Sequence, residues 1–572
     1  MEIAPPSVHV RAIDEEHLEK TNATVLDRVF AARGVNQGEE LDRNLAHLLA
    51  PDTLSGILPA ANRIVSAILN DELILIIGDY DADGATATAL AISLLNALGA
   101  TSVDFMIPDR FALGYGLSEE IVRLSEDRQP NLIVTVDNGI SSNAGVALAN
   151  QLGFDVIITD HHLPGSQIPP AIAIVNPNIP ECEFQSKNLA GVGVIFYVLI
   201  KVRELLDKMD WFEKHDRPNI ADWLDLVALG TVADVVKLDR NNRILVDQGL
   251  KRIRAGKIRP GVQALCEISG KDVVAISSSD LAFSLGPRLN AAGRLDDMTI
   301  GVKCLLESNM RSARDYASTL DELNKYRRQI ESTMVDDAKL ILAGMSPEDF
   351  EASGICLYEP SWHQGVVGIV AGRLKDRLYK PVIAFAAAGE GAPNDLKGSA
   401  RSIPNFHIRD ALDAIAASYP GMISKFGGHA MAAGVTIAKS HYERFAKAFS
   451  DQVAATISAD VLERKVFTDG VLGPAELNVD TARLIASAGP WGQGFPEPLF
   501  EGVFEIVSQR RVGGIHLKLV VRKEGLLVDA IAFSQEPIQN CELIRLIYRL
   551  QENDYQASGT LQLVVEHIVP LP

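Results

Sequence analysis

The segment IIGDYDADG, residues 76–84, continues an apolar run that begins at residue 73 and ends in three aspartates. A short, continuous run of aliphatic residues is typical of a strand buried on both faces of a parallel sheet. Asp79, Asp81 and Asp83 follow at alternate positions, and alternate side chains of an extended chain point the same way. Since three converging like charges repel one another, a bound metal is one interpretation, and an acidic, solvated turn is the other.

The same pattern repeats on the C-terminal side of this stretch. Between residues 72 and 175 the chain alternates short runs rich in Ile and Val with polar turns and helix-like stretches. The runs that predict strands are 73–77, 103–107, 132–136, 156–159 and 172–175, and helices are expected at 85–98 and 141–152. Alternating strands and helices are typical of βαβ units, so we predict an α/β domain built on a parallel sheet.

The length of the chain predicts several domains. At 572 residues it exceeds what one hydrophobic core usually supports. Neither Gly nor Pro occurs between Gly301 and Gly344, where apolar and charged residues mix at helical spacing, which predicts a long connecting helix. The expected domains are an N-terminal helical extension (1–70), a first α/β domain (71–300), the connecting helix (301–345), a second α/β domain (346–460) and a C-terminal β domain (466–572).

The C-terminal region changes to a β pattern. Apolar residues alternate or cluster between turns at 504–512, 516–522, 526–532, 543–550 and 561–568. Five short strands suit a small barrel of the OB type, although other β-barrels fit the pattern nearly as well. An OB barrel would help to hold a single nucleic-acid strand without contributing to chemistry.

Composition limits the class of protein. A formal charge of −20 argues against indiscriminate coating of nucleic acid, but residues 237–259 carry eight Lys or Arg against two Asp, which is either a local binding patch or a solvated helical face. The five cysteines form no CxxC pair and are expected to be small apolar fillers. No signal-peptide pattern and no apolar run of about 18 residues occur, so a cytoplasmic protein without a membrane span is expected.

Three further strings place acids or imidazoles at the ends of apolar segments. They are VTVDNG (134–139), ITDHH (158–162) and ALGTVADVV (228–236). Taken alone, Asp137 is more often a cap, and a histidine at a strand end is usually unremarkable, whereas the buried acid Asp234 needs a partner. In parallel sheets, sites form beyond the carboxyl ends of the strands, so these signals converge on one location.

The four strings, in this order and spacing, resemble the phosphoesterase motifs of the DHH superfamily in the form carried by its bacterial single-stranded-DNA-specific exonucleases. The match continues with GPRLNAAGR (286–294), SWHQGVVG (361–368), GSARS (398–402) and FGGHA (426–430), of which the later strings are similar to the DHHA1 motifs of that superfamily. The resemblance covers most of the chain. It implies a DHH catalytic domain, a DHHA1 domain and an OB-like barrel.

Carried over motif by motif, the resemblance implies two Mn²⁺ or Mg²⁺ ions. The implied metal ligands are Asp81, Asp83, Asp137, His161 and Asp234, with Asp137 as the bridge. Oxygen-rich ligands with one imidazole suit these metals better than a structural zinc ion. The residues expected to serve catalysis beside the ligands are His162, Asp79 and Asp160. His162 is the candidate to contact the scissile phosphate. Asp79 either ligates a metal directly or orients another ligand without touching the metal.

An exonuclease also needs a pocket for the terminal phosphate. Arg pairs bidentately with phosphate oxygens, and a neighbouring hydroxyl supplies a further donor. The resemblance supports Arg288, Ser399 and Arg401 as 5′-phosphate ligands, with His429 nearby and Arg110 along the strand path. The alternative for each string seen alone is a surface arginine with a turn serine.

The resemblance implies a 5′-to-3′ exonuclease on single-stranded DNA that releases 5′-mononucleotides during DNA repair and recombination. It also implies single-strand-binding protein and a RecQ-type helicase as partners, and a monomer is expected. The alternatives are a DHH-type phosphodiesterase or pyrophosphatase for small substrates and a non-catalytic replication scaffold. The small-substrate enzymes need only the two α/β modules, and a scaffold would not need every ligand position to be occupied.

Overall fold

The computed structural model describes residues 6–13, 23–35, 39–110, 116–389, 391–458, 461, 463–539, 541–553 and 559–571. Parts of the expected N-terminal extension, residues 1–5, 14–22 and 36–38, lie outside this set. The chain divides into two compact units. The larger unit comprises Arg11–Asn324 and Thr468–Pro572, and the smaller unit comprises Met1–Val10 and Lys325–Phe467.

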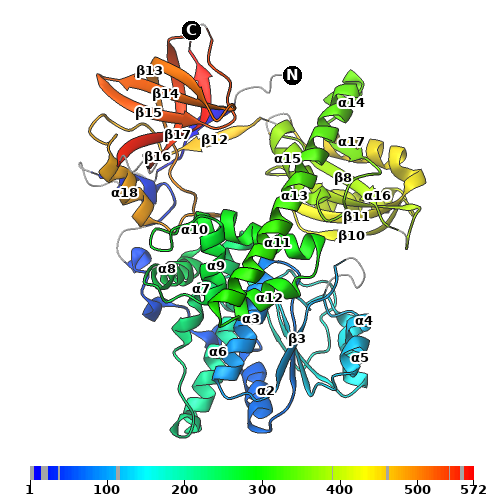
Figure 1. Cartoon of the computed structure of the whole chain (residues 1–572). Coiled ribbons are helices and arrows are strands. Elements are labelled where there is room, and N and C mark those ends of the chain that lie inside the picture. The colour runs from blue at the N-terminus through cyan, green and yellow to red at the C-terminus, as the bar shows by residue number, and fades with distance from the viewer. Residues whose placement is uncertain are drawn as a thin grey trace. The chain divides into compact units, whose positions relative to one another are not determined.

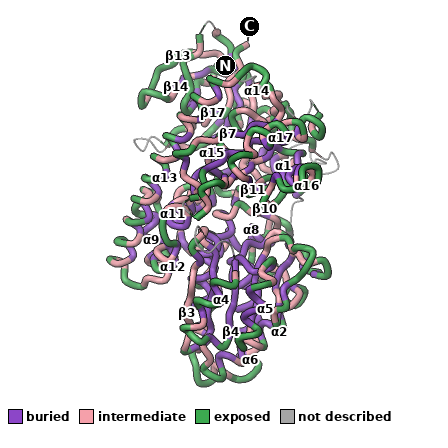
Figure 2. Tube along the Cα trace, turned by 90° about the vertical axis from the view of Figure 1, so that its right-hand side faces the viewer, coloured by how far each residue is buried: buried purple, intermediate pink, exposed green. Residues whose placement is uncertain are grey.

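The larger unit contains a five-stranded sheet in the order β3-β2-β4-β5-β6, in which all neighbours are parallel. Its strands are β2 (Ile74–Ile77), β3 (Val103–Met106), β4 (Leu132–Val136), β5 (Asp155–Thr159) and β6 (Ala173–Val175). Every residue of β2 and β4 is buried, whereas the edge strand β3 is half-buried, as the trace in Figure 2 shows. The parallel sheet predicted from the Ile- and Val-rich runs is confirmed.

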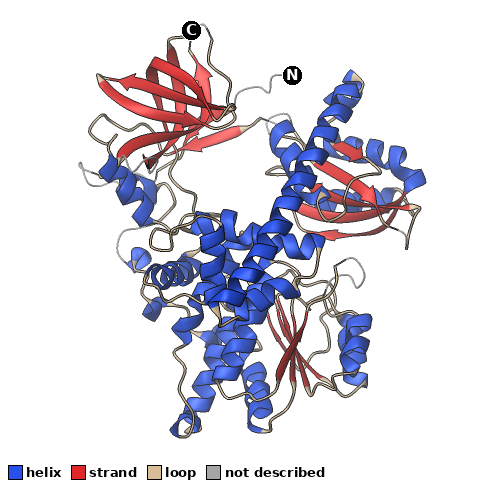
Figure 3. Ribbon diagram, in the orientation of Figure 1, coloured by secondary structure: helices blue, strands red, loops and turns tan. Residues whose placement is uncertain are grey.

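The helices before residue 307 form most of the core of this unit, and several of them pack on the sheet (Figure 3). They are α1 (Val25–Ala31), α2 (Ile57–Leu69), α3 (Ala82–Ala97), α4 (Glu119–Glu126), α5 (Asn143–Gln151), α6 (Gly191–Lys208), α7 (Leu224–Ala233), α8 (Arg240–Arg254), α9 (Pro260–Ile268), α10 (Ser278–Asp280), α11 (Gly286–Leu295) and α12 (Thr299–Leu306), with a π-helix, η7 (Leu281–Leu285), between α10 and α11. Short 3₁₀ turns lie at Glu39–Leu41, Leu45–His47, Pro51–Thr53, Trp211–Glu213 and Ile220–Trp223. Helices α3, α6 and α7 are apolar on most of their surface because they pack against one another, and α3 and α6 also pack on the sheet. Among the described residues no helix is long and apolar enough to span a bilayer.

The long helix expected at 301–345 is two helices in the structure. Helix α12 ends at Leu306, and α13 (Met310–Gly344) begins after a short break. The Asn309 side chain accepts hydrogen bonds from the N–H groups of Arg311 and Ser312, at 2.9 and 3.3 Å, and so caps the new helix. Asn is a favoured N-cap residue, and a stop made this way needs neither Gly nor Pro.

The smaller unit contains a mixed sheet in the order β10-β11-β9-β8-β7. Its strands are β7 (Ile355–Tyr358), β8 (Val382–Ala387), β9 (Asp395–Arg401), β10 (Ile423–Gly428) and β11 (Ala432–Ala438). Only β7 and β8 pair in parallel, and the other pairs are antiparallel. The helices of this unit are α14 (Pro347–Glu351), α15 (Val367–Leu378), α16 (Ile408–Ser418) and α17 (Tyr442–Thr456), with a 3₁₀ turn at Lys439–His441. The second α/β module is therefore confirmed.

The C-terminal strands close into a barrel in the order β13-β14-β15-β17-β16 (Figure 1). They are β13 (Phe500–Val512), β14 (His516–Lys523), β15 (Leu526–Ala532), β16 (Leu543–Asn553) and β17 (Thr560–Pro570). Four neighbouring pairs are antiparallel, and β15 with β17 is parallel. Helix α18 (Val479–Ala488) packs on the barrel through Ala482 and Ile485. Five strands with one parallel closing pair match the predicted OB-like barrel.

The N-terminal segment and the residues before the barrel are packed together. Strand β1 (Ser7–Val10) pairs with β12 (Lys465–Thr468), so the extension expected to be helical begins with a strand among its described residues. Both Arg33 and Asp469 are buried and form a bidentate ion pair, with donor-acceptor distances of 2.6 and 3.1 Å. Trp491 stacks on Phe30 and Phe495, and Phe495 belongs to the large core.

Candidate functional site

Four segments of the larger unit bring the acidic strings together. Asp79 and Asp137 follow β2 and β4, and His161 follows β5, which lies next to β4 in the sheet. Asp81 is the N-cap of α3, and Asp234 is the C-cap of α7. Since the carboxyl ends of neighbouring parallel strands open on the same edge, the sheet itself gathers these side chains.

Asp137 has an unusual backbone conformation. Its φ of 64° lies in the left-handed region, which few residues other than Gly adopt. Helix α6 begins directly against it, because a Cβ placed on Gly191 would lie 2.4 Å from the Cβ of Asp137. The side-chain amide of Asn138 donates to the carbonyls of Ile77 and Val136, at 3.0 and 2.9 Å, and fixes the turn. The carboxylate of Asp137 is therefore held in place from both sides.

Asp83 is fully buried and accepts two backbone hydrogen bonds from the start of α6. The N–H groups of Gly191 and Val192 donate to its two oxygens, at 2.6 and 3.0 Å. The positive end of a helix dipole and its unsatisfied N–H groups favour an anion at this place. Gly230 of α7 allows the close approach of a second helix, because its Cβ would lie 2.8 Å from Oδ1 of Asp83.

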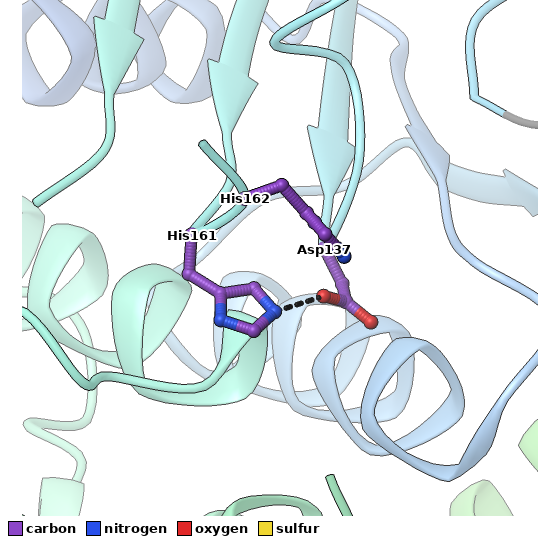
Figure 4. Close-up of side chains that lie close together, drawn as sticks. All are labelled: Asp137, His161 and His162. Carbon is purple, nitrogen blue, oxygen red and sulfur yellow. Dashed lines mark ion pairs between the residues drawn. The ribbon is translucent and has the colours of Figure 1, made fainter. Parts of the chain in front are cut away.

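The side chains form three groups that could each hold a metal ion, in which the ligand atoms lie within 4.8 Å of one another. The groups are Asp83, His161 and Asp234; Asp79, Asp81 and Asp137; and Asp137, His161 and His162. The Nε2 atom of His161 lies 3.0 Å from Oδ1 of Asp137, the contact drawn in Figure 4, and 3.5 Å from Oδ2 of Asp234. Asp137 and His161 each occur in two groups, so the groups are contiguous.

The carboxylates raise one another's pKa. Burial, followed by repulsion from Asp234, raises the pKa of Asp83 to about 7. Burial and repulsion from Asp81 raise the pKa of Asp234 to about 8 and hold that of Asp79 well above its ordinary range. The pKa of Asp137 is raised well above its ordinary range by burial and then by the neighbouring aspartates. Concentrated, buried negative charge of this kind is what divalent cations neutralise.

Asp160 and His162 form a separate pair. Nδ1 of His162 lies 2.7 Å from Oδ1 of Asp160, which also accepts hydrogen bonds from the N–H groups of His161 and His162. Burial alone would lower the pKa of His162, but the hydrogen bond and charge of Asp160 raise it to about 9. Burial would raise the pKa of Asp160, yet His162 lowers it. In contrast, burial and the neighbouring His162 lower the pKa of His161, which suits a neutral metal ligand.

The donor set fits a pair of divalent metal ions. It offers carboxylate oxygens and one imidazole with a lowered pKa, and Nε2 of that imidazole lies between two carboxylates. Hard oxygen ligands with an imidazole suit Mn²⁺ or Mg²⁺. Asp79 was expected either to ligate a metal directly or to orient another ligand. Its carboxylate lies in a candidate ligand group with Asp81 and Asp137.

The smaller unit brings together three of the residues expected at a terminal phosphate. Ser399 and Arg401 lie at alternate positions of β9, which pairs with β11 so that Arg401 is opposite Ala432. His429 lies in the turn before β11, and its N–H donates to the carbonyl of Ala432 at 2.8 Å. A Cβ on Gly368 would lie 2.7 Å from Nη2 of Arg401 and 3.2 Å from the Ser399 hydroxyl. The first turn of α15 therefore packs on both side chains and adds the anion preference of a helix N-terminus.

The other two phosphate candidates lie in the larger unit. Arg288 of α11 is buried and donates to Asp321 and to the carbonyl of Ser284, at 2.8 and 2.6 Å. The guanidinium of Arg110 lies over the ring of Tyr80, 4.7 Å from its centre, beside the first acidic string. The Arg288 guanidinium therefore already has structural partners.

Sequence reasoning missed Asn290. Its side-chain oxygen accepts a hydrogen bond from the N–H of Ala82, at 2.8 Å, and so fixes the first turn of α3 between Asp81 and Asp83. The neighbouring Gly293 allows this contact, because its Cβ would lie 1.7 Å from the carbonyl oxygen of Tyr80. The amide within the string GPRLNAAGR was the available signal, but only the fold shows what it contacts.

The basic segment at 237–259 is largely used within the fold. Arg243 is buried with its guanidinium over Phe495, and Arg259 forms an ion pair with the buried Asp225, at 2.9 Å. Lys251 pairs with Asp247 on the same helix. The interpretation of this run as a helical face is favoured over a continuous nucleic-acid patch.

The comparisons with known proteins agree with this architecture. Residues 73–231 match the model of the DHH family, N-terminal domain; residues 351–455 match that of the DHHA1 domain; and residues 468–567 match that of the RecJ OB domain. The fold and the acidic site thus define a DHH-family protein with DHHA1 and OB domains.

Similar proteins define the family of this chain more narrowly. A single-stranded-DNA-specific exonuclease RecJ from Escherichia coli is 48% identical over 556 residues, which cover 96% of each chain. The protein of the same name from Haemophilus influenzae is also 48% identical, covering 96% of this chain and 97% of that one. The crystal structure of RecJ in complex with Mn²⁺ from Thermus thermophilus matches with a TM-score of 0.82 and 29% identity, covering 99% of this chain and 80% of that one. The chain belongs to the RecJ family.

Proposed function

We propose that this protein is a single-stranded-DNA-specific exonuclease that hydrolyses phosphodiester bonds from the 5′ end and releases 5′-mononucleotides, in DNA repair and recombination. The observation that carries the proposal is the contiguous set of ligand groups at the carboxyl edge of the parallel sheet, joined through Asp137 and His161. Relatives that match 96% of this chain are named single-stranded-DNA-specific exonucleases.

Two divalent ions, Mn²⁺ or Mg²⁺, fit this set. We assign Asp81, Asp83, Asp137, His161 and Asp234 as ligands, with Asp137 shared between the ions, and add Asp79 because its carboxylate lies in the group of Asp81 and Asp137. Solved structures of RecJ proteins are described in complex with Mn²⁺ and with Mg²⁺. When bound, such a pair activates water and neutralises charge on the phosphate in an in-line displacement.

We assign His162 to the scissile phosphate. Its Nδ1 is held by the buried Asp160, which fixes the ring and favours the protonated imidazole. An imidazolium donates a hydrogen bond from Nε2 to a phosphate oxygen and balances negative charge that develops during displacement. Asp160 acts by positioning His162, because its oxygens are taken up by His162 and by backbone N–H groups.

We assign Ser399 and Arg401 to the terminal 5′-phosphate, with His429 beside them. The start of α15 lies against Ser399 and Arg401, so a hydroxyl, a guanidinium and a helix N-terminus are gathered at one place. Arg288 and Arg110 are proposed as further contacts to the strand, and the barrel is proposed to add affinity for it. Single-strand-binding protein and a RecQ-type helicase remain proposed partners on resemblance alone.

The test is degradation of end-labelled DNA. With Mn²⁺ or Mg²⁺, we expect 5′-phosphorylated single strands to be shortened from the 5′ end into mononucleotides, while blunt duplexes and chelated reactions stay intact. A small-substrate phosphodiesterase would instead prefer a dinucleotide to a long strand. A replication scaffold would cleave neither.

A further inference from the structure

A small apolar cavity lies beside the acidic site in the larger unit. It has a volume of about 180 Å³, below the roughly 300 Å³ at which pockets for small-molecule ligands begin. Four segments line it: the chain after α7, the α10–η7 turn, the loop before the barrel and strand β16. A space of this size suits one planar ring rather than a whole cofactor.

Phe283 is the most exposed of the large apolar side chains that line the cavity. It is 72% exposed, although it lies in the middle of the π-helix η7, whose flanking residues Leu281 and Leu285 are fully buried. π-Helical turns are rare and occur frequently at functional sites. The buried Leu281 and Leu285 anchor the turn that presents the Phe283 ring to solvent.

The second apolar wall comes from a strained residue. Val235 has a φ of 59°, in a region that β-branched residues rarely adopt, and it is 55% exposed. Val235 directly follows Asp234, which the proposed function makes a metal ligand. The left-handed turn therefore aims Asp234 at the acidic site and Val235 at the cavity.

Helix η7 packs against the end of the helix that precedes Asp234. A Cβ on Gly286, directly after η7, would lie 3.1 Å from the Cβ of Ala233, the last residue of α7. The end of η7 is therefore packed against the end of α7, and Asp234 is the residue after Ala233.

Polar and charged groups at the rim fit a nucleotide rather than an apolar peptide. Lys237 is exposed, and its stem lies against Gly494, whose Cβ would be 2.4 Å from its Cγ. Glu497 and Arg549 also line the cavity, but they pair with each other at 3.6 Å, and Arg549 pairs with Glu566 at 3.0 Å, so Gln493 supplies the polar group for a base edge and Lys237 supplies the positive charge. An aromatic platform with nearby cations is the usual arrangement for a single strand.

We propose that Phe283 is a stacking platform for one nucleobase of the substrate strand, which enters the cavity between Phe283 and Val235 while its neighbouring phosphate lies at the acidic site. The inference rests on the proposed function for the identity of the strand. It assigns a base-binding role that the metal ligands and the terminal-phosphate residues do not supply. Because every base has a π-face, the platform is tolerant of sequence.

The test uses the full chain without added metal, so that the strand stays intact. A 5′-phosphorylated single strand carries one 2-aminopurine, placed at successive positions from the 5′ end, and its fluorescence falls when the base stacks. We expect strong quenching confined to one or two adjacent positions. Phe283→Ala should abolish it and weaken strand affinity roughly 5- to 150-fold.

Three variants sharpen the result. Phe283→Tyr should keep the quenching, and Phe283→Leu should lose it, because Leu retains apolar area but has no π-face. Val274→Ala is the matched control, since Val274 is 70% exposed outside the cavity, and it should behave as the parent protein. Phe283 is so exposed that its replacement leaves the core intact, which circular dichroism checks.

Equal quenching and equal affinity in the parent and Phe283→Ala proteins would overturn the inference, and the exposed ring would then serve another occupant, such as a partner protein. The proposed function is judged separately, by hydrolysis of the same strand after Mn²⁺ is added. A parent protein that quenches but does not hydrolyse would reject the nuclease and leave the base site standing.

Discussion

Asp137 occupies the position where the ligand groups meet, and its carboxylate is held by a left-handed turn and by the start of α6. Replacing it with Ala removes a ligand that both ions are proposed to share, so we expect hydrolysis to fall by several orders of magnitude. The measurement is single-turnover cleavage of a 5′-labelled strand at saturating Mn²⁺, with circular dichroism to verify the fold. Near-normal cleavage by a well-folded Asp137→Ala protein would refute the assignment.

The raised pKa values of the carboxylates predict how the metal-free protein responds to pH. Asp83 and Asp234 titrate with a pKa of about 7 and about 8 in the folded chain, far above the value of about 3.9 in an unfolded chain. The folded state therefore binds more protons than the unfolded state between about pH 4 and 8, and its stability decreases as the pH rises through that window.

We expect the melting temperature of the chelator-treated protein to fall between about pH 6 and pH 8.5, and saturating Mn²⁺ to remove or reverse this trend, because the metal requires deprotonated ligands. Differential scanning calorimetry at constant ionic strength measures both. An apo protein that becomes more stable towards the alkaline end of this range would contradict the mutual repulsion of these acids.

Arg401 is predicted to recognise the terminal 5′-phosphate rather than the phosphates within the strand. Its position beside Ser399 and the start of α15 suits a doubly charged end group. Arg401→Ala should reduce cleavage strongly, at least tenfold, on 5′-phosphorylated strands and much less on 5′-hydroxyl strands. An equal loss on both substrates would reject the role, and Arg409→Ala, on helix α16 of the same unit, serves as the control.

The N-terminal end of helix α6 packs against the acidic site. Its first residue, Gly191, touches Asp137 and donates to Asp83. A methyl group there cannot fit at 2.4 Å, so Gly191→Ala must displace either the helix or the Asp137 turn. We expect metal affinity and activity to fall at least tenfold while the secondary structure is retained.

Gly193→Ala is the matched control on the same helix. The atoms nearest to its Cβ would belong to the side chain of Leu189, the closest at 3.2 Å, which is tight but adjustable. Isothermal titration with Mn²⁺ compares the two variants. If both bound metal equally well, the close approach of α6 would have no functional role.

The sequence predicted which strands and helices form better than it predicted where they end and what they contact. Buried strands such as β4 were found at their observed bounds, because a short apolar run between turns allows few other structures. The break before α13 was missed because α12 ends at Leu306 and Asn309 caps the next helix without Gly or Pro. The π-helix η7 was missed because its extra residue leaves no periodic signal over so short a segment.

From the sequence one could predict which side chains gather at the candidate site, but not which groups surround them. Asp79, Asp137 and His161 follow strands of one sheet, so topology alone brings them together. The donors from α6 to Asp83, and the contact of Asn290 with Ala82, join segments distant in the sequence, and no local pattern specifies them. The structure likewise revealed that Arg288 is already paired with Asp321.

At the scale of the whole molecule, the residues before the barrel belong to the packing of the N-terminal segment. Phe495 is buried in the large core, and the carbonyl of Pro496 accepts a hydrogen bond from Arg33, at 2.9 Å. Asp469 joins the two ends of the chain, because it pairs with Arg33 and accepts the N–H of Leu499, at 3.0 Å. The barrel is therefore tied to the N-terminal segment through buried polar contacts as well as apolar ones.

The variant Asp469→Asn tests this connection between the barrel and the N-terminal segment. The change removes one charge of a pair whose side chains are 2% and 1% exposed, and it leaves the Arg33 guanidinium buried without its counter-charge. Breaking one partner of a buried pair costs about 3–5 kcal/mol, whereas an exposed pair contributes about 0–1 kcal/mol. Asp480→Asn is the control, because Asp480 is 88% exposed and pairs with Arg483 at the surface. Denaturant unfolding followed by Trp fluorescence and by circular dichroism should show a large loss for Asp469→Asn and almost none for Asp480→Asn. If the two variants unfolded at the same denaturant concentration, the buried pair would not hold the ends of the chain together, and the barrel would be an independently stable domain.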